Sequence, residues 1–392
     1  MSLILLGEGW WVGHFIFGDE HEQLRRSVRR FVERELAPHA DEWEEAGGFP
    51  EEVFRRLGAQ GFLGLRYPEE YGGQGGDYYT AIVLAEELAG CRSGGLATAV
   101  EVHTEMATPP IHKFGTDEQK RRFLGPAIKG EKVSALAITE PEAGSDVAAI
   151  RMSAVRDGDS YVLNGSKRFI TNGCRADFVV VVARTDKEQQ WAGLSLFIVE
   201  KGTPGFAVAR RLEKVGLHSS DTAELVFEDC RVPAENLLGQ VNQGFYHIMW
   251  ELQGERLIGA AGSVAGGQRA LDLAIKYGGE RIQFGRPVGK FQANRHHLAE
   301  HATALEAARQ LVYATAWRVQ KGEYPVKEIS MCKLFAARTA FAAADFALQL
   351  HGGMGYMMES EVQRIWRDAR AWRIAAGTDE VMLEVISNEL GL

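Results

Sequence analysis

The chain has 392 residues and a formal net charge of −9, with 45% hydrophobic and 25% charged residues. The length predicts two or three domains, and the composition is that of an ordinary globular protein. The acidic balance argues against a nucleic-acid partner, because no face of the protein is forced to be basic. The four cysteines contain no C-x-x-C pair. Their scatter predicts neither a disulfide framework nor a cysteine zinc site and fits a reducing compartment.

Residues 1–18 alternate short apolar runs with glycines and polar residues. No run reaches the length of a transmembrane helix, and no basic stretch precedes an apolar one as in a signal peptide. We therefore predict a disordered extension over 1–18 and no membrane-spanning segment. A contact with a membrane surface or with another subunit is the alternative.

Residues 19–133 are predicted to form an N-terminal helical domain. Leu24, Val28 and Val32 recur at helical spacing, and Pro38 ends this first helix. Further helices are predicted over 51–60, 79–89 and 96–108.

Residues 134–240 change to β-branched runs separated by turns. The segment 177–184 is a continuous run of this kind, and 194–200 and 224–227 are shorter ones. Asn164-Gly165 predicts a tight turn at the end of a strand that begins at Tyr161. We therefore predict a small antiparallel β domain over 134–240.

Residues 241–392 are predicted to form a C-terminal four-helix-bundle domain. Long periodic segments rich in alanine cover 257–277, 293–321, 328–350 and 381–390. Helices of this length with short connections pack as a bundle. The predicted fold class is α+β, mainly α, with an N-terminal helical domain, a central antiparallel β domain and a C-terminal bundle.

Two stretches of the β region carry the most specific signal. The segment 135–146 reads as a short apolar strand that breaks into Thr-Glu-Pro-Glu-Ala-Gly-Ser-Asp, and 164–173 reads Asn-Gly-Ser-Lys-Arg-Phe-Ile-Thr-Asn-Gly. A strand that ends in hydroxyls and free amides presents donors to a flat polar ligand, although an ordinary strand exit explains the first stretch equally well. Together, their order and spacing closely resemble the acyl-CoA dehydrogenase family of flavoenzymes. The resemblance extends from Asp19 to the C-terminus and implies the acyl-CoA dehydrogenase fold.

The resemblance also implies that the protein binds FAD. Residues of the β region would cover the flavin, and they are Leu136, Ile138, Thr139, Gly144, Ser145, Phe169, Ile170 and Thr171. Residues of the C-terminal region would meet the rest of FAD, in part across a subunit interface, and they are Arg281, Phe284, Gln292, Gln349, Leu350, Gly352, Gly353, Thr378 and Glu380. Local explanations stay open for several of these, because a helix dipole or a helix cap also favours a C-terminal arginine, terminal glycines and N-terminal acids.

Dehydrogenation of an acyl thioester requires a carboxylate that removes the α-proton in a water-poor pocket. Many family members carry this glutamate just before a Gly-Thr pair, where this chain has Ala376. A minority, including isovaleryl-CoA and long-chain acyl-CoA dehydrogenases, carry it in a Glu-Arg-Leu sequence that matches Glu255-Arg256-Leu257 here. The resemblance therefore implies that Glu255 is the base and that the N–H of Ala376 polarises the thioester carbonyl. The substrate-binding residues that it implies are Ser145, Tyr246, Arg256, Ala376 and Gly377.

The helix position of Glu255 supports this interpretation. On a helix, Glu255 shares a face with Gly259, Gly262 and Gly266. Such a face allows close approach by another helix or by a ligand. The alternative is that Glu255 pairs with a surface lysine or arginine, as most glutamates do.

The function implied is FAD-dependent α,β-dehydrogenation of an acyl-CoA thioester to trans-2-enoyl-CoA, in fatty-acid or branched-chain amino-acid catabolism. The partners implied are acyl-CoA, an electron-transferring flavoprotein and further copies of the chain in a homotetramer built as a dimer of dimers, with no nucleic acid and no membrane. The compartment implied is the cytoplasm, or the mitochondrial matrix in a eukaryote. A flavin oxidase or monooxygenase of the same fold and a non-catalytic acyl-CoA-binding homologue are the alternatives.

Two further features suggest other ligands. Arg92 lies where glutaryl-CoA dehydrogenase carries an arginine for a distal carboxylate, although that enzyme has its base at the other position. His297, Glu300 and His301 fit H-x-x-E-H, an inverted zinc-protease motif that would place two imidazoles one helical turn apart. The motif falls on an ordinary bundle helix of the family, and the sequence offers no evident third ligand. We therefore predict no metal site and keep a zinc hydrolase as a remote alternative.

Overall fold

The computed structural model describes residues 14–189 and 191–392 and divides into two compact units. Unit 1 comprises Met1–Asp41, Asp77–Gly94 and Arg256–Leu392, and unit 2 comprises Glu42–Gly76 and Gly95–Glu255. Each unit thus gathers segments that are far apart in the sequence. The three domains predicted with boundaries after 18, 133 and 240 follow the chain instead of this division, and these boundaries stay predictions.

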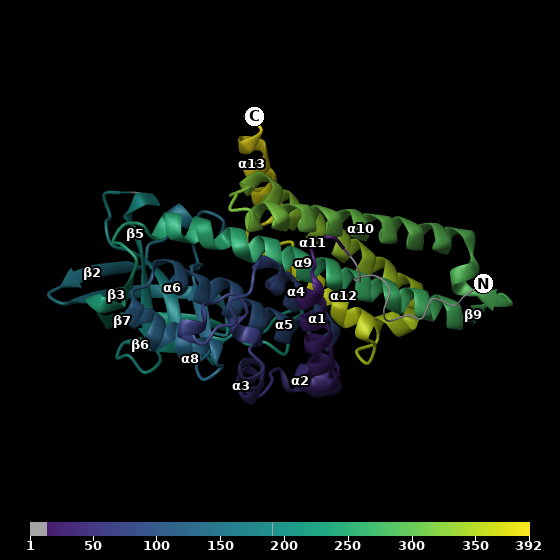
Figure 1. Cartoon of the computed structure of the whole chain (residues 1–392), viewed down its shortest axis with the longest axis horizontal. Coiled ribbons are helices and arrows are strands. Elements are labelled where there is room, and N and C mark those ends of the chain that lie inside the picture. The colour runs from purple at the N-terminus through teal and green to yellow at the C-terminus, as the bar shows by residue number, and fades with distance from the viewer. Residues whose placement is uncertain (1–13, 190) are drawn as a thin grey trace. The chain divides into compact units, whose positions relative to one another are not determined.

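Unit 1 is helical. Its helices are α1 (Asp19–Phe31), α4 (Tyr78–Leu88), α10 (Gln292–Gln320), α11 (Val326–His351), α12 (Glu361–Ala371) and α13 (Asp379–Glu389), together with the later part of α9 (Gly244–Glu280). Helix α11 is central, since α10, α12 and α13 all pack against it (Figure 1). Its buried side chains are mostly small, which lets the neighbouring helices approach closely; they include Ala336, Ala340, Ala343, Ala344 and Ala347.

Residues 14–18 pack within unit 1, which corrects the disorder predicted for this part of the 1–18 extension. Ile16 is buried in the core, and the ring of Phe17 stands edge-on to Tyr313 with the ring centroids 5.1 Å apart. His14 lies against the same tyrosine at 4.8 Å. The apolar residues of this segment therefore bury surface that a disordered chain would leave in water. The other residues of the predicted extension, 1–13, lie outside the described residues.

Unit 2 contains an eight-stranded sheet. The strands are β1 (Ser134–Ala137), β2 (Ser153–Asp157), β3 (Ser160–Thr171), β4 (Phe178–Arg184), β5 (Leu194–Glu200), β6 (Phe206–Arg211), β7 (Thr222–Pro233) and β8 (Leu237–Leu238). Their order is β6-β7-β3-β2-β4-β5-β8, with β1 paired to β4. Most pairs are antiparallel, as predicted, whereas β1 runs parallel to β4. The predicted fold class, α+β and mainly α, is confirmed.

The tight turn predicted at Asn164-Gly165 is wrong. Strand β3 includes both residues and continues beyond them to Thr171. Its pairing with β7 shifts register between Leu163 and Gly165, as at a β-bulge. Gly165 has φ +147°, and a Cβ at this position would lie 2.8 Å from the side chain of Met152. The glycine therefore serves a close packing contact at a bulge instead of a hairpin turn.

Helices flank the sheet within unit 2. They are α3 (Glu52–Ala59), α6 (Thr108–Phe114), α7 (Asp117–Gln119) and α8 (Gly125–Ile128), together with α5 (Gly94–Glu101), whose first residue belongs to unit 1. Helices α2 (Ala40–Ala46) and α9 also contain residues of both units. A π-helical segment, η6 (Val102–Ala107), continues α5 and packs on β1. In this segment the buried His103 lies 2.9 Å from the carbonyl oxygen of Ala127 and accepts the N–H of Ser134 at 3.1 Å. Burial lowers the pKa of His103 to about 4, so this imidazole joins η6 to the start of β1 in its neutral form.

Over the described ranges 14–189 and 191–392, none of the helices combines the length and the apolar character that crossing a bilayer requires.

Candidate functional site

The two motif stretches of the β region meet where β1 ends. The N–H of Arg168 on β3 donates to the carbonyl oxygen of Thr139 at 2.8 Å. The ammonium group of Lys167 donates to the carbonyl oxygen of Ile138 and to Oε1 of Glu140, both at 2.8 Å. Segments 27 to 29 positions apart in sequence are thus joined by backbone and side-chain hydrogen bonds.

The ion pair of Lys167 and Glu140 holds this junction from inside. Lys167 is fully buried and Glu140 is 7% exposed. Glu140 also accepts the backbone N–H groups of Arg151 at 2.8 Å and Met152 at 3.0 Å. Burial lowers the pKa of Lys167 to about 8, and the charge of Glu140 opposes that shift. The sequence analysis assigned no role to this pair, although the lysine stands in the middle of the second motif.

The residues predicted to cover the flavin divide into anchors and surface groups. Leu136 and Ile170 are buried, whereas Gly144 and Ser145 are exposed. Phe169 is 61% exposed and has φ +62°, a conformation that is strained for a bulky side chain. Strain of this kind persists where the surroundings impose it, and it often marks a ligand site. An exposed aromatic ring of this kind fits a flat group such as the flavin of FAD.

The residues predicted to meet the rest of FAD lie mostly on the surface of unit 1. Arg281, Gln292, Gln349 and the two glycines of the 352–353 pair are exposed, and Phe284 is 93% exposed. The ring of Tyr277 on α9 stacks on His351 of α11 with centroids 4.3 Å apart, so the structure brings the ends of these two helices together. Such exposed groups fit a ligand shared with a second chain, as predicted, and their roles stay predictions.

The loop that contains Ala376 is held by four cations of unit 1. Ala376 and Gly377 have φ +57° and +101°. The guanidinium of Arg256 donates to the carbonyl oxygen of Ala376 at 2.9 Å, and the buried Lys333 donates to that of Gly377. Below the loop, Thr378 caps α13 by accepting the N–H of Val381 at 3.3 Å. The last two cations, Arg338 and Arg373, bind the buried Asp379 at 3.0 and 2.7 Å. These bonds orient the backbone N–H that is predicted to polarise a thioester.

Glu255 lies in a buried acidic environment. It is 6% exposed. Glu101 interacts electrostatically with Glu255 and also with Glu105. Glu105 is ion-paired with Arg66, whereas Oε2 of Glu101 has no hydrogen-bond partner among the described residues. Burial, with the charges of Glu105 and Glu255 added, raises the pKa of Glu101 to about 8. A surface ion pair therefore does not describe Glu255, and a buried carboxylate of this kind is what proton abstraction requires.

Replacing Glu101 with glutamine is expected to raise the free energy of unfolding at about pH 9 and to change it little at about pH 4. The folded-state pKa of about 8 lies above the ordinary value of 4.5, so the folded protein holds a proton that the unfolded chain has released. The stabilising contribution of Glu101 is complete below pH 4.5 and is lost as pH rises through 8. Urea unfolding across this range measures the effect, and a difference between variant and parent that does not grow with pH would contradict it.

The glycine face of α9 is filled in part by protein. A Cβ at Gly259 would lie 2.4 Å from the ring of Trp372, so this glycine lets the indole pack directly on the helix. Gly266 has open space around its α-carbon. The close approach predicted for this face is therefore realised at Gly259 by a side chain of unit 1.

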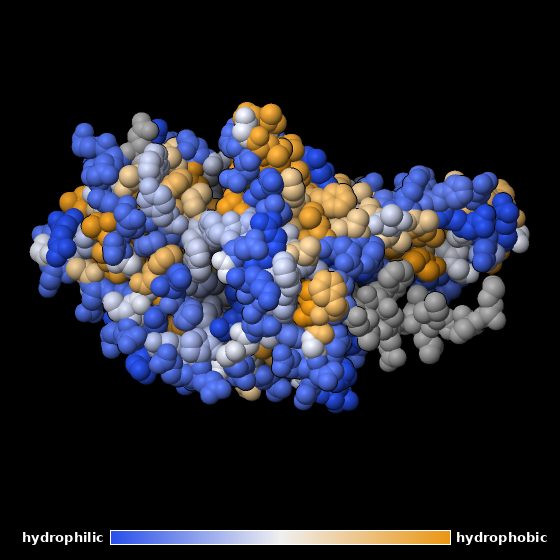
Figure 2. Space-filling view, turned by 45° about the horizontal axis from the view of Figure 1, so that its top comes forward, coloured by the Kyte–Doolittle hydropathy of each residue, from blue (hydrophilic) through white to orange (hydrophobic). Residues whose placement is uncertain are grey.

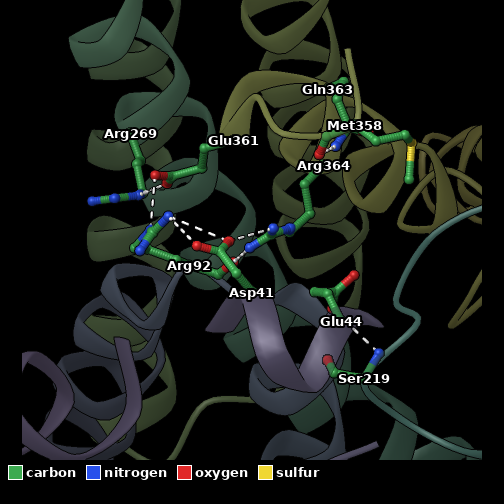
Figure 3. Close-up of polar contacts among 9 residues, drawn as sticks. All are labelled: Asp41, Glu44, Arg92, Ser219, Arg269, Met358, Glu361, Gln363 and Arg364. Carbon is green, nitrogen blue, oxygen red and sulfur yellow. Dashed lines mark hydrogen bonds and ion pairs between the residues drawn. The ribbon is translucent and has the colours of Figure 1, made fainter. Parts of the chain in front are cut away.

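Arg92 does not present a free charge to a carboxylated substrate. Its guanidinium donates to Glu361 at 3.1 Å and to Asp41 at 3.2 Å, and the same aspartate pairs with Arg364 at 2.7 Å (Figure 3). Arg269 binds the other oxygen of Glu361. Two carboxylates thus already neutralise Arg92, which argues against the distal-carboxylate role suggested by its position.

The H-x-x-E-H residues lie on the surface of α10. His297 is 3.1 Å from Glu300, and both side chains are more than half exposed. The rings of His297 and His301 pack beside Phe346 at 5.5 and 5.1 Å. Within the described part of the chain, no three His, Cys, Asp or Glu side chains are placed to hold a metal ion.

Comparisons with known proteins cover nearly the whole chain. Three family models match: "Acyl-CoA dehydrogenase, N-terminal domain" over 18–131, "middle domain" over 135–230 and "C-terminal domain" over 242–391. A probable acyl-CoA dehydrogenase, YngJ, of Bacillus subtilis is 40% identical over 96% of this chain and 99% of its own length. The crystal structure of an acyl-CoA dehydrogenase from Geobacillus kaustophilus superimposes with a TM-score of 0.94 at 41% identity, covering 97% of this chain and all of the other.

Similar proteins also carry other names. An acryloyl-CoA reductase (NADH) of Anaerotignum propionicum is 41% identical over 95% of this chain and 94% of its own length. The solved structure of the prolyl acyl carrier protein oxidase AnaB is 32% identical with a TM-score of 0.91, covering 96% of this chain and all of the other. Proteins similar to this chain are therefore named as dehydrogenases, as a reductase and as an oxidase.

Proposed function

Since this chain belongs to the acyl-CoA dehydrogenase family of FAD-dependent oxidoreductases, we propose that it oxidises an acyl-CoA thioester to the trans-2-enoyl-CoA. The observation that carries the proposal is Glu255, a buried carboxylate in the Glu-Arg-Leu position, in a chain whose other base position is Ala376. A non-catalytic homologue would have no need to retain a buried carboxylate at this place.

The proposed chemistry removes two hydrogens from the acyl chain. Glu255 takes the α-proton, and the N–H of Ala376 donates to the thioester carbonyl as negative charge develops on its oxygen. The hydrogen bond from Arg256 to the carbonyl oxygen of Ala376 supports this role, because it holds the backbone of Ala376 in place. FAD, when bound, accepts the β-hydrogen as a hydride. Glu255 is 6% exposed, and exclusion of water from the base favours proton transfer from carbon.

Partners follow from the same proposal. The electron acceptor is an electron-transferring flavoprotein, the compartment is the cytoplasm or a mitochondrial matrix, and the pathway is fatty-acid or branched-chain amino-acid catabolism. The assembly is a homotetramer in which Arg281 and Gln292 reach the FAD of a neighbouring subunit. Exposed apolar side chains support a subunit contact by unit 1: Figure 2 shows apolar surface at the top of the view, where Figure 1 places the end of α13, and Leu390 and Leu392 are 56% and 88% exposed.

The purified protein is expected to be yellow, with FAD near one per subunit, and to transfer electrons from an acyl-CoA to an artificial acceptor. A panel of straight, branched and carboxylated acyl-CoA esters, assayed with and without oxygen, measures the substrate and separates a dehydrogenase from an oxidase. Reduction of the flavin by NADH and turnover of an enoyl-CoA would instead favour the reductase direction. An absorbance spectrum without flavin bands, even after addition of FAD, would contradict the proposal.

A further inference from the structure

A second bulge interrupts β3 at Arg168 and Phe169. The pairing of β3 with β7 shifts register between Lys167 and Ile170, so that two residues of β3 lie opposite the single residue Glu224 of β7. Phe169 takes up the extra length with φ +62°, and the guanidinium of Arg168 lies 5.1 Å from the centroid of its ring. Bulges redirect side chains out of the regular alternation of a strand and are frequent beside active sites. The bulge therefore presents a cation and an aromatic ring together.

The charge of Arg168 is not balanced by the chain. Arg168 is half-buried and forms no ion pair with any residue that the structure describes. Its Nε atom is buried and has no hydrogen-bond partner among the same residues. Glu224, which lies opposite, binds Arg210 at 2.9 Å, and Glu140 binds Lys167. A buried donor without an acceptor costs free energy, so we expect a group from outside the chain to satisfy it.

The bulge adjoins the residues that are predicted to cover the flavin. The N–H of Arg168 donates to the carbonyl oxygen of Thr139 at 2.8 Å, which holds the bulge beside the end of β1. Ile138 and Thr139 on one segment, and Phe169 and Ile170 on the other, were assigned to the flavin, whereas Arg168 was assigned no role. The nitrogen that lacks a partner thus belongs to the part of the fold where the flavin is expected.

We propose that Arg168 supplies a positive charge that stabilises the reduced, anionic form of the flavin. The inference rests on the FAD of the proposed function and adds a residue that tunes the bound cofactor. The ring system of oxidised flavin is uncharged. A hydride that bonds to N5 brings two electrons and one proton, and the ring then carries one negative charge. A fixed cation attracts the reduced ring more strongly than the oxidised ring and so raises the reduction potential.

The reduction potential of bound FAD tests the proposal without any acyl substrate. Arg168→Met is titrated against a redox dye with protein in excess over FAD. The ratio of reduced to oxidised flavin at a given potential is expected to fall about tenfold, which for a two-electron couple is a shift of about 30 mV to lower potential. Arg168→Lys keeps the charge and should retain most of the parental potential. Arg156→Met is the matched control, because Arg156 is an exposed cation of the same sheet, 5.7 Å from the ring of Tyr161.

Other contacts of Arg168 predict different results. An arginine that binds the phosphates of FAD would leave the potential unchanged and weaken FAD binding in Arg168→Met, because the phosphate charge is the same in both redox states. An arginine that docks an acidic electron-accepting protein would leave both unchanged and raise only the KM for that protein. Either result would overturn the inference, as would an Arg168→Lys potential as low as that of Arg168→Met.

Arg168→Gln repeats the comparison if Arg168→Met does not retain FAD. Loss of FAD from both uncharged variants would overturn the inference, because Arg168 would then be needed to hold oxidised FAD, whose ring is uncharged. A chemical reductant takes the place of acyl-CoA in each measurement. The outcomes therefore do not depend on whether the protein oxidises a thioester, and a failure of the proposed function is distinguishable from a failure of this inference.

Discussion

Replacing Glu255 with glutamine is expected to abolish reduction of the flavin by the best acyl-CoA substrate while FAD content and ligand binding stay near those of the parent. Glutamine keeps the size and the hydrogen-bonding capacity of the side chain but cannot accept the α-proton. Loss of a general base typically costs about a hundredfold to ten-thousandfold in rate, and a reaction that depends on one carboxylate belongs at the upper end. Stopped-flow absorbance under anaerobic conditions measures the reduction directly.

Glu251→Gln is the matched control for this variant. Glu251 lies one turn earlier on α9 and is also buried, so the change removes a charge of the same kind at a position with no proposed role in proton transfer. Its rate of flavin reduction should stay within a few-fold of the parent. If Glu255→Gln reduces its flavin as fast as the parent, the base lies elsewhere and the central assignment is wrong.

The second base position of the family offers a complementary arm of the same test. Adding Ala376→Glu to Glu255→Gln is expected to restore measurable flavin reduction, since in the family both positions serve the same α-carbon. Ala376 already has φ +57°. A glutamate there adds little backbone strain, because any residue with a Cβ meets the same steric cost in this conformation.

Periodicity predicted the elements whose stability is local. The segments predicted over 293–321 and 328–350 correspond to α10 and α11, with ends shifted by one or two residues. Long amphipathic helices are predictable because their apolar residues recur at helical spacing. The β-branched run 177–184 likewise became β4. The bulge at Gly165 and the π-helical turn of η6 were missed, because each depends on a tertiary contact that leaves no periodic signal: Met152 in one case and β1 in the other.

The residues of the candidate site that belong to a sequence motif were predictable. The residues that reach the site only through tertiary packing were not. Glu255 followed from the Glu-Arg-Leu match, yet nothing in the sequence indicated that Glu101 would share its buried environment. Trp372, which fills the space beside Gly259, was missed for the same reason, since the two residues are 113 positions apart. For Arg92 the sequence position suggested a role in binding a carboxylate of the substrate. In the fold, however, Asp41 and Glu361 already neutralise its charge. Pairings between distant segments are set by topology, and a single sequence does not display them.

Replacing Lys167 with methionine is expected to destabilise unit 2 strongly and to release FAD. Methionine fills most of the volume of the lysine stem but leaves the buried carboxylate of Glu140 without its cation. Removing one partner of a buried ion pair costs about 3–5 kcal/mol, because the remaining charge loses its compensation while staying out of water. The free energy of unfolding from urea titration, with FAD fluorescence as a second signal, measures both effects. Lys201→Met, an exposed lysine of unit 2, should behave like the parent.

The double variant Lys167→Met with Glu140→Gln distinguishes the charge from the packing. Glutamine can still accept the N–H groups of Arg151 and Met152 with its carbonyl oxygen, but it carries no charge that needs a partner. The double variant should therefore be more stable than Lys167→Met alone, by an amount that a double-mutant cycle yields. A double variant no more stable than the single one would mean that the hydrogen bond from Lys167 to Ile138, and not the ion pair, joins the two motifs. Either result locates the force that brings the end of β1 to β3, the junction over which the flavin is proposed to lie.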